Sequence, residues 1–185
     1  MSLTEFLARI ARCLGSADIP FMLTGSLASA YYGTPRATQD VDLVIDTSEE
    51  QLERLLHLLV EDRLYVSRDA AVEALGGGGQ FNVIDSSTGW KADLIIRRDR
   101  EFSRAEFSRR QKTVLFGVDV SLTTAEDLII AKLEWSEMGD SELQRRDIVQ
   151  LLEAGGSSLD YDYLMKWIVV LGLEEAWSKV APSRA

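Results

Sequence analysis

Gly25-Ser26 and, after thirteen intervening residues, Asp40-Val41-Asp42-Leu43-Val44-Ile45 are the stretches of sequence that decide the fold. The second stretch alternates aspartates with apolar residues, and alternate residues of a strand point to the same face of a sheet. The pattern therefore predicts a strand that turns apolar side chains into the core and presents Asp40 and Asp42 together on the opposite face.

Two carboxylates held this close repel each other, and a positive charge between them relieves the repulsion. A hard divalent cation such as Mg²⁺ prefers oxygen ligands of this kind. Gly25-Ser26 lies between a predicted strand, Phe21-Met22-Leu23, and a predicted short helix over residues 27–32. Glycine lets the backbone approach a ligand closely, and the free N–H groups at the start of a helix bind phosphate. Together, the two stretches predict a site for a metal–nucleoside triphosphate.

The rest of the chain is expected to be mixed α/β up to residue 122 and helical afterwards, because of the spacing of its apolar residues and its turn signals. We therefore expect an α/β core over residues 1–122 and a C-terminal helical region over residues 123–185. The other expected helices are 3–14, 47–61, 69–75, 100–110, 123–138, 141–155, 160–170 and 173–180. The other expected strands are 63–67, 80–85, 90–96 and one or two within 113–122.

Two of these helices are predicted to begin with a capping box. Thr47 pairs with Glu50, and Thr123 pairs with Glu126. In each pair the two side chains would satisfy backbone N–H groups that the first turn of the helix leaves without partners.

The charge and cysteine content restrict the class of protein. The 185 residues include 20 basic and 30 acidic ones, a net charge of −10, which argues against a broad nucleic-acid-binding surface. Residues 97–112 depart from this balance, with seven basic side chains against three acidic ones. They could contact an anionic acceptor such as tRNA, or they could form a solvated helix face. The single cysteine, Cys13, excludes an internal disulfide and fits a reducing compartment.

No apolar run approaches the ~20 residues that a membrane-spanning helix needs. The N-terminal residues also lack the basic start and purely apolar centre of a signal peptide. We therefore expect a cytoplasmic protein without a membrane partner.

The pattern of Gly25-Ser26 followed by Asp40-x-Asp42 on an apolar strand resembles the signature of the DNA-polymerase-β-like nucleotidyltransferase superfamily. Within it, the stretch from Thr34 to Leu43 is similar to the AbiEii-type toxin branch and its uncharacterised bacterial relatives. Patterns over residues 81–94 and 126–147 are similar to the same relatives. The resemblance implies a mixed α/β (α+β) nucleotidyltransferase fold, with a mixed β-sheet flanked by helices and a C-terminal helical part.

The resemblance also implies a third carboxylate on a neighbouring strand, and Asp93 is the matching position. Asp40, Asp42 and Asp93 would then be both the catalytic residues and the ligands of Mg²⁺ (or Mn²⁺). Such ions activate the acceptor hydroxyl and stabilise the pyrophosphate leaving group.

Five further positions would bind the nucleotide by the same resemblance: Gly25, Ser26, Arg36, Lys132 and Asp147. Two alternatives stay open from the residues themselves. Lys132 and Asp147 lie on consecutive predicted helices, where an ion pair between the helices would place them equally well. Arg36 could instead pair with an acid on the surface.

The implied activity is transfer of a nucleoside monophosphate from an NTP to a hydroxyl acceptor, either an RNA end such as that of tRNA or a protein, in a toxin-like role. The alternative is a non-catalytic module that binds a nucleotide or a partner within a toxin–antitoxin-like system, with an antitoxin protein as the partner. A third possibility is a small acceptor such as an aminoglycoside, whose positive charge the acidity of the chain would suit.

Overall fold

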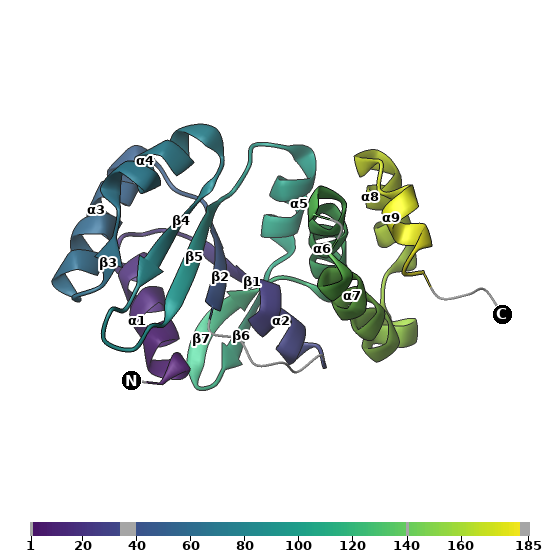
Figure 1. Cartoon of the computed structure of the whole chain (residues 1–185), viewed down its shortest axis with the longest axis horizontal. Helices are drawn as coiled ribbons and strands as arrows, with labels where there is room; N and C mark the ends of the chain where they lie inside the picture. Colours follow the sequence, from purple (N-terminus) through teal and green to yellow (C-terminus); the bar gives the residue numbers. More distant parts are fainter. Residues whose placement is uncertain (1, 34–39, 140, 182–185) are drawn as a thin grey trace.

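A mixed seven-stranded β-sheet lies at the centre of the residues that the computed structural model describes, which are 2–33, 40–139 and 141–181 (Figure 1). Its strands are β1 Phe21–Thr24, β2 Asp40–Ile45, β3 Tyr65–Val66, β4 Gln80–Ile84, β5 Lys91–Ile96, β6 Gln111–Leu115 and β7 Val118–Leu122. They follow the order β3-β4-β5-β2-β1-β7-β6. β2 runs parallel to β5 and β1 parallel to β7, while the other neighbours are antiparallel. The predicted mixed sheet is therefore confirmed.

Helices cover both faces of the sheet (Figure 1). On one side lie α1 Leu3–Ser16, α3 Glu49–Glu61 and α4 Arg68–Gly77. On the other side lie α2 Gly25–Tyr31, α5 Glu101–Arg109, α6 Ala125–Gly139, α7 Glu142–Gly155, α8 Tyr161–Leu171 and α9 Glu174–Ser178, with a 3₁₀ turn, η1 Gly156–Ser158, after α7. The expected α/β arrangement followed by a helical part is thus present. The division into two domains at residue 122 stays a prediction.

The strands β2 and β5 alternate as the sequence predicted. Val41, Leu43 and Ile45 are fully buried in the core, whereas Asp40 and Asp42 point to the other face and are only partly buried. β5 repeats the pattern with its own apolar residues. The core face fixes the register, because a shift by one residue would move every aspartate inward.

Both predicted capping boxes are wrong by one residue. Ser48, not Thr47, caps α3: its hydroxyl accepts a hydrogen bond from the Gln51 N–H, and the Gln51 side chain accepts one from the Ser48 N–H. The sequence around residues 47–51 contains overlapping capping patterns, so the pattern alone does not choose between them.

At the start of α6, the Thr124 hydroxyl accepts a hydrogen bond from the Asp127 N–H, in place of the predicted Thr123 with Glu126. The cause lies in the sheet. The Thr123 N–H donates to the carbonyl of Leu23 at 3.0 Å and so prolongs the β1–β7 pairing by one residue. The helix therefore begins one residue later than the sequence predicted.

A buried carboxylate, Asp127, joins α5, α6 and α8. It is fully buried and accepts hydrogen bonds from Thr124 Oγ1 at 2.7 Å, Arg109 Nε at 3.1 Å and Tyr163 Oη at 2.6 Å. The Arg109 guanidinium also lies 3.9 Å from the centroid of the Tyr163 ring. Burial and the hydrogen bond to Asp127 raise the pKa of the Tyr163 hydroxyl, which therefore remains a donor. These bonds attach the C-terminal helices to the rest of the fold.

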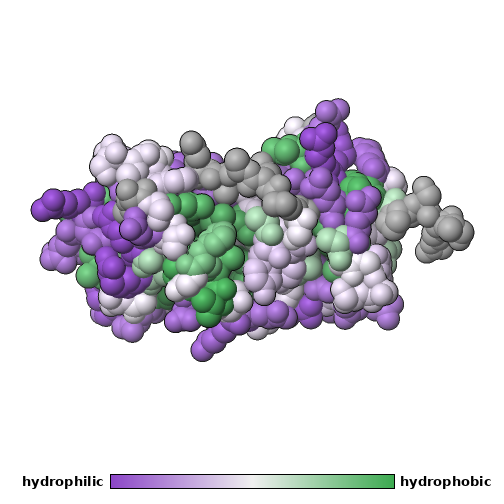
Figure 2. Space-filling model, turned by 90° about the horizontal axis from the view of Figure 1, so that it is seen from below, coloured by the Kyte–Doolittle hydropathy of each residue, from purple (hydrophilic) through white to green (hydrophobic). Residues whose placement is uncertain are grey.

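Polar side chains cover most of the face that is seen from below in Figure 2, with an apolar group near its centre. Among the exposed large apolar residues are Val114 and Phe116, in the edge hairpin of β6 and β7. Within the described residues, no helix combines the length and the apolar character that crossing a membrane requires.

Tyr163→Phe should lower the free energy of unfolding by about 1.5–3 kcal/mol, the range for a hydrogen bond to a charged partner. The substitution removes only the hydroxyl that donates to Asp127. Chemical denaturation measures the effect. Tyr161→Phe on the same helix, at a residue that is 37% exposed, is the control and should change stability little. An equal, small effect of the two substitutions would contradict this account of the Asp127 network.

Candidate active site

A row of polar side chains crosses four strands of the sheet. Asp42 lies beside Thr24 of β1 on one side and beside Asp93 of β5 on the other, and Asp93 in turn lies beside Asn82 of β4. The parallel pairing of β2 and β5 thus brings the third predicted carboxylate directly next to the Asp-x-Asp pair. Asp40 is one step away on the same face, beside Lys91.

Thr24, Asp40, Asp42 and Asp93 line a cavity of about 330 Å³ between the sheet and α6. Six of the residues predicted for the site line it: Gly25, Ser26, Asp40, Asp42, Asp93 and Lys132. Gln80, Gln144 and Trp135 complete its polar rim. The fold therefore gathers most of the predicted residues in one place, although it does not by itself assign a role to any of them.

Gly25 is needed because Asp42 packs against its backbone. Gly25 has a φ of +64°, and a Cβ at this position would lie 1.9 Å from Asp42 Oδ2. The neighbouring Ser26 N–H, which the sequence suggested would face phosphate, donates to the same Asp42 oxygen at 3.4 Å. Glycine here permits a close approach of backbone and carboxylate that any other residue would prevent.

The negative charges of Asp40 and Asp93 repel that of Asp42. Burial raises the pKa of Asp42, and the nearby charges of Asp93 and Asp40 raise it further, against the Ser26 N–H and Lys132, which lower it. Asp93 Oδ1 is buried and receives no hydrogen bond from the described residues. The site thus has an excess of buried negative charge and an oxygen without a donor.

Lys91 supplies part of the missing positive charge. Its Nζ lies 3.2 Å from Asp93 Oδ2 and 3.5 Å from Asp40 Oδ1, between the two strands. Burial opposes the charged form, but the hydrogen bond to Asp93 and the nearness of both carboxylates raise the pKa of Lys91 overall. The sequence held a signal for this residue, because Lys91 precedes Asp93 by two positions on a strand and so shares its face.

The three carboxylates are the candidate ligands for a divalent cation. Within the described part of the chain, no group of three or more His, Cys, Asp or Glu side chains is arranged to hold a metal ion. The donor chemistry nevertheless suits Mg²⁺, because all the candidate ligands are oxygens and the Lys91 ammonium stands where positive charge is required. Asp40, Asp42 and Asp93 could hold such an ion once Lys91 moves aside.

Lys132 and Asp147 form the ion pair between helices that the sequence left open as an alternative. Lys132 Nζ lies 2.8 Å from Asp147 Oδ2 and 3.0 Å from Gln144 Oε1, and both charged residues are almost fully buried. Lys132 also lines the cavity, whereas Asp147 is not among its described lining residues. Asp147 thus contacts a residue of the cavity, Lys132, without lining the cavity itself. Arg36 lies outside the described residues.

Trp135 of α6 belongs to the cavity, although the sequence analysis did not name it as a site residue. It is 49% exposed and lines the cavity beside the carboxylates. The signal was its position three residues after Lys132 on the same helix, which puts both side chains on one face. Trp167, by contrast, is buried.

Solved structures resemble the chain over almost its whole length. The solution structure of the antibiotic-resistance factor ANT(2'')-Ia matches with a TM-score of 0.62 at 13% sequence identity, covering 95% of this chain and 97% of that protein. A crystal structure of ANT(2'')-Ia in complex with adenylyl-2''-tobramycin gives 0.56 at 12% identity, covering 96% and 98%. A nucleotidyltransferase-like protein from Paracoccidioides brasiliensis gives 0.50 at 17% identity, covering 94% and 91%.

The chain has the nucleotidyltransferase fold. No protein-family model matches the sequence, and a search of curated proteins finds no significant match. Membership of the AbiEii-type branch therefore stays a prediction.

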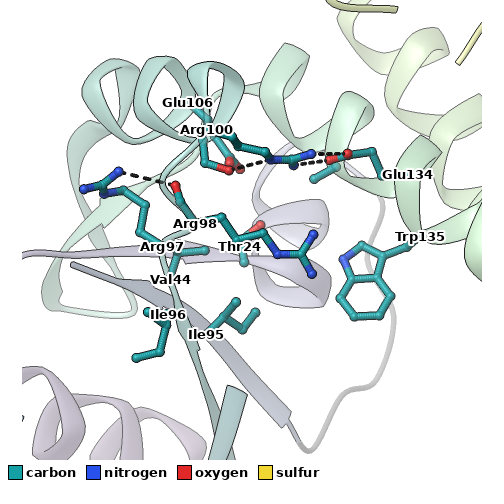
Figure 3. A pocket seen from close by; sticks show the side chains of 12 residues that line it. Thr24, Val44, Ile95, Ile96, Arg97, Arg98, Arg100, Glu106, Glu134 and Trp135 are labelled. Carbon is teal, nitrogen blue, oxygen red and sulfur yellow. Dashed lines mark hydrogen bonds and ion pairs between the residues drawn. The ribbon is translucent and has the colours of Figure 1, made fainter. Parts of the chain in front are cut away.

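A second cavity of about 110 Å³ adjoins the first in this nucleotidyltransferase fold (Figure 3). The two cavities share Thr24, Ile95, Ala131 and Trp135 as lining residues. The remaining wall of the second cavity consists of Val44, Ile96, Arg97, Arg98, Arg100, Ser103, Glu106 and Glu134. The sequence analysis did not predict this cavity, because its residues come from β2, β5, α5 and α6 without a common motif.

Gly25→Ala should destabilise the protein by about 1–3 kcal/mol, because the new methyl group collides with Asp42 as well as straining the backbone. Urea denaturation measures the loss. Gly117→Ala is the matched control: Gly117 has a φ of +80°, but a Cβ there meets nothing within 4 Å. Equal losses in the two variants would mean that backbone strain alone, and not the packing of Asp42, requires a glycine.

Lys91→Met should make the protein less stable in EDTA and should increase the stabilisation that Mg²⁺ gives. Without Lys91, the carboxylates lose their counter-charge, and a cation no longer has to displace it. A tenfold gain in Mg²⁺ affinity would add about 1.4 kcal/mol at saturation. Thermal unfolding with and without Mg²⁺ measures both effects, and Lys112→Met, at an exposed residue, is the control. If Mg²⁺ raises the unfolding temperature of the variant no more than that of the wild type, the Lys91 ammonium does not occupy the position of the cation.

Proposed function

We propose that the chain is a metal-dependent nucleotidyltransferase that moves a nucleoside monophosphate from an NTP to a hydroxyl acceptor. The observation that carries the proposal is the juxtaposition of Asp42 and Asp93 on parallel strands, with the Lys91 ammonium between Asp93 and Asp40. A structural surface has no need to bury carboxylates beside one another. A site that binds the divalent cation of a metal–nucleotide complex does need them.

The reaction would form a bond between the acceptor oxygen and the α-phosphorus and break the bond from that phosphorus to the β-phosphate oxygen, releasing pyrophosphate. Mg²⁺ (or Mn²⁺) held by Asp40, Asp42 and Asp93 would activate the acceptor hydroxyl and neutralise charge on the phosphates. Asp93 Oδ1, which receives no hydrogen bond from the described residues, is suited to accept the proton of that hydroxyl.

Lys132 would hold the triphosphate on the opposite wall of the cavity. Its ammonium is fixed by Asp147 and Gln144, so its position is already set before a ligand binds. A cation fixed in this way stabilises developing negative charge without having to reorganise. In this proposal Asp147 positions Lys132 and does not contact the nucleotide, which reconciles the ion pair between the helices with a role at the site.

The acceptor that best suits the chain is a small, positively charged molecule. Four arginines of the basic segment 97–112 are paired with acids: Arg97 with Asp46, Arg100 with Glu134, Arg104 with Asp99, and Arg109 with Asp127 and Glu126. These pairs weaken the case for tRNA docking on this segment. A net charge of −10 attracts cations, and ANT(2'')-Ia, a protein of similar fold, is known in complex with an adenylylated tobramycin. An RNA end or a protein hydroxyl, and a toxin-like role, remain the other candidates.

Asp42→Asn should reduce the affinity for Mg²⁺–NTP by at least about 100-fold, since even residues that only orient a metal ligand contribute 10- to 100-fold. Calorimetric titration of each NTP with Mg²⁺ measures the loss. Asp119→Asn, at an exposed aspartate of β7, is the matched control and should bind like the wild type.

Transfer itself is tested with an NTP labelled at the α-phosphate, incubated with an aminoglycoside, with tRNA or with the protein alone. Label appearing on one acceptor with the wild type, and not with Asp42→Asn, supports the enzyme. Metal-dependent NTP binding without transfer to any of these would favour the non-catalytic binding module. Undiminished transfer by Asp42→Asn would exclude the mechanism.

A further inference from the structure

We propose that the second cavity is the nucleobase pocket of the nucleotide site, in which Glu106 reads the hydrogen-bonding edge of the base between Arg98 and Trp135. The inference rests on the proposed function, because it takes the NTP phosphates to lie at the carboxylates in the first cavity. It adds a determinant of base specificity, which the sequence motifs do not indicate.

The position of the second cavity suits the base of a nucleotide whose phosphates lie in the first. Val44 and Ile95 follow Asp42 and Asp93 by two residues on the same face of their strands, which is about 7 Å along the sheet. The two cavities also share four lining residues, so a single ligand can enter both. The apolar side chains of Val44 and Ile95 would form the floor under the base.

The size of the cavity indicates one planar ring system. Its volume of about 110 Å³ is well below the ~300–1,000 Å³ of pockets that hold whole drug-sized ligands. An oligosaccharide or an RNA stem would not fit inside it. The larger neighbouring cavity, about 330 Å³, has room for the phosphates.

The charges on the wall are largely neutralised, which suits an uncharged ligand. Arg97 Nη2 lies 3.0 Å from Asp46 Oδ1. Arg100 makes two bonds to the Glu134 carboxylate, at 2.6 and 2.5 Å, and its Nε donates to Ser103 Oγ at 2.9 Å (Figure 3). These pairs occupy the charged groups around Glu106.

Glu106 takes no part in these ion pairs. It is only 8% exposed and makes no hydrogen bond or ion pair with the described residues, although it lines the cavity. Burial, together with the charges of Asp127 and Glu134 on α6, raises the pKa of its carboxyl to about 8, against Arg100. Near neutral pH it therefore carries a proton and offers one donor and one acceptor side by side, which matches the edge of a nucleobase.

Arg98 and Trp135 provide flat surfaces on either side of the entrance. Figure 3 shows the Arg98 guanidinium extending toward the Trp135 indole, with Glu106 and Arg100 on the helix side of the cavity and Val44 and Ile95 on the strand side. Both Arg98 and Trp135 are exposed. An aromatic ring and a guanidinium are the side chains on which bases stack.

The test is calorimetric titration of ATP, GTP, CTP and UTP, each with Mg²⁺, and of inorganic tripolyphosphate with Mg²⁺, which reports on the phosphate site alone. We expect the wild type to prefer one base by at least about tenfold. Trp135→Ala should weaken NTP binding roughly 5- to 150-fold, the usual effect of losing one stacking contact, and should leave tripolyphosphate binding unchanged. Glu106→Leu should remove the preference among the bases.

The pH dependence separates base reading from a purely structural role of Glu106. Above pH 8 the carboxyl loses its proton and its donor, so the base preference of the wild type should decline between pH 7 and pH 9. Glu106→Gln keeps a donor and an acceptor without a titrating group, and its preference should not change over this range. Glu101→Gln, at an exposed glutamate of the same helix, is the control and should behave like the wild type.

Several outcomes would overturn the inference. If tripolyphosphate binds but the wild type does not discriminate among bases, or if discrimination survives both Glu106→Leu and Trp135→Ala, the cavity is not the base pocket, while the proposed function stands. If neither an NTP nor tripolyphosphate binds with Mg²⁺, the inference and the proposed function both fail. If Glu106→Leu does not fold, Trp135→Ala still decides, since Trp135 is half exposed and its loss leaves the core intact.

Discussion

Repulsion between neighbouring carboxylates is the constraint on which the rest of the site depends. The parallel pairing of β2 and β5 sets Asp42 beside Asp93, and the buried faces of the same strands prevent either side chain from turning away. Three nearby groups offset this repulsion: the Ser26 amide, the Lys91 ammonium and the charge of Lys132. The hydrophobic core thus holds the carboxylates together, and the polar face is organised to tolerate them.

Much of the fold could be predicted from the sequence because the signals were local. The alternation in Asp40–Ile45 fixes a strand and its two faces, and the turn before Lys91 predicts the hairpin that carries Asp93. The error at the start of α6 has a non-local cause. Thr123 prolongs a strand pairing that depends on a distant residue, Leu23, so the capping pattern one residue early could not reveal the true start of α6.

The site was predictable where one motif carried it and unpredictable where the packing of helices carried it. Lys91 and Trp135 each shared a face with a predicted residue, so spacing held a signal for them. The second cavity had no such signal, since Glu106, Trp135 and Val44 meet only when α5 and α6 pack over the sheet. The Lys132–Asp147 ion pair was one of two alternatives, and the structure shows it. Lys132 also lines the cavity, and nucleotide binding by Lys132 and Asp147 stays a prediction.

The position of Lys91 between Asp93 and Asp40 bears on how the protein folds and takes up a metal ion. Because the chain supplies its own counter-ion, the sheet can assemble during synthesis without waiting for an external cation. If the proposed function is right, acquisition of a divalent ion would be an exchange, in which the Lys91 side chain leaves as the ion arrives. Free magnesium in the cell, and not only its total supply, would set how much of the protein is ready for substrate at a given moment.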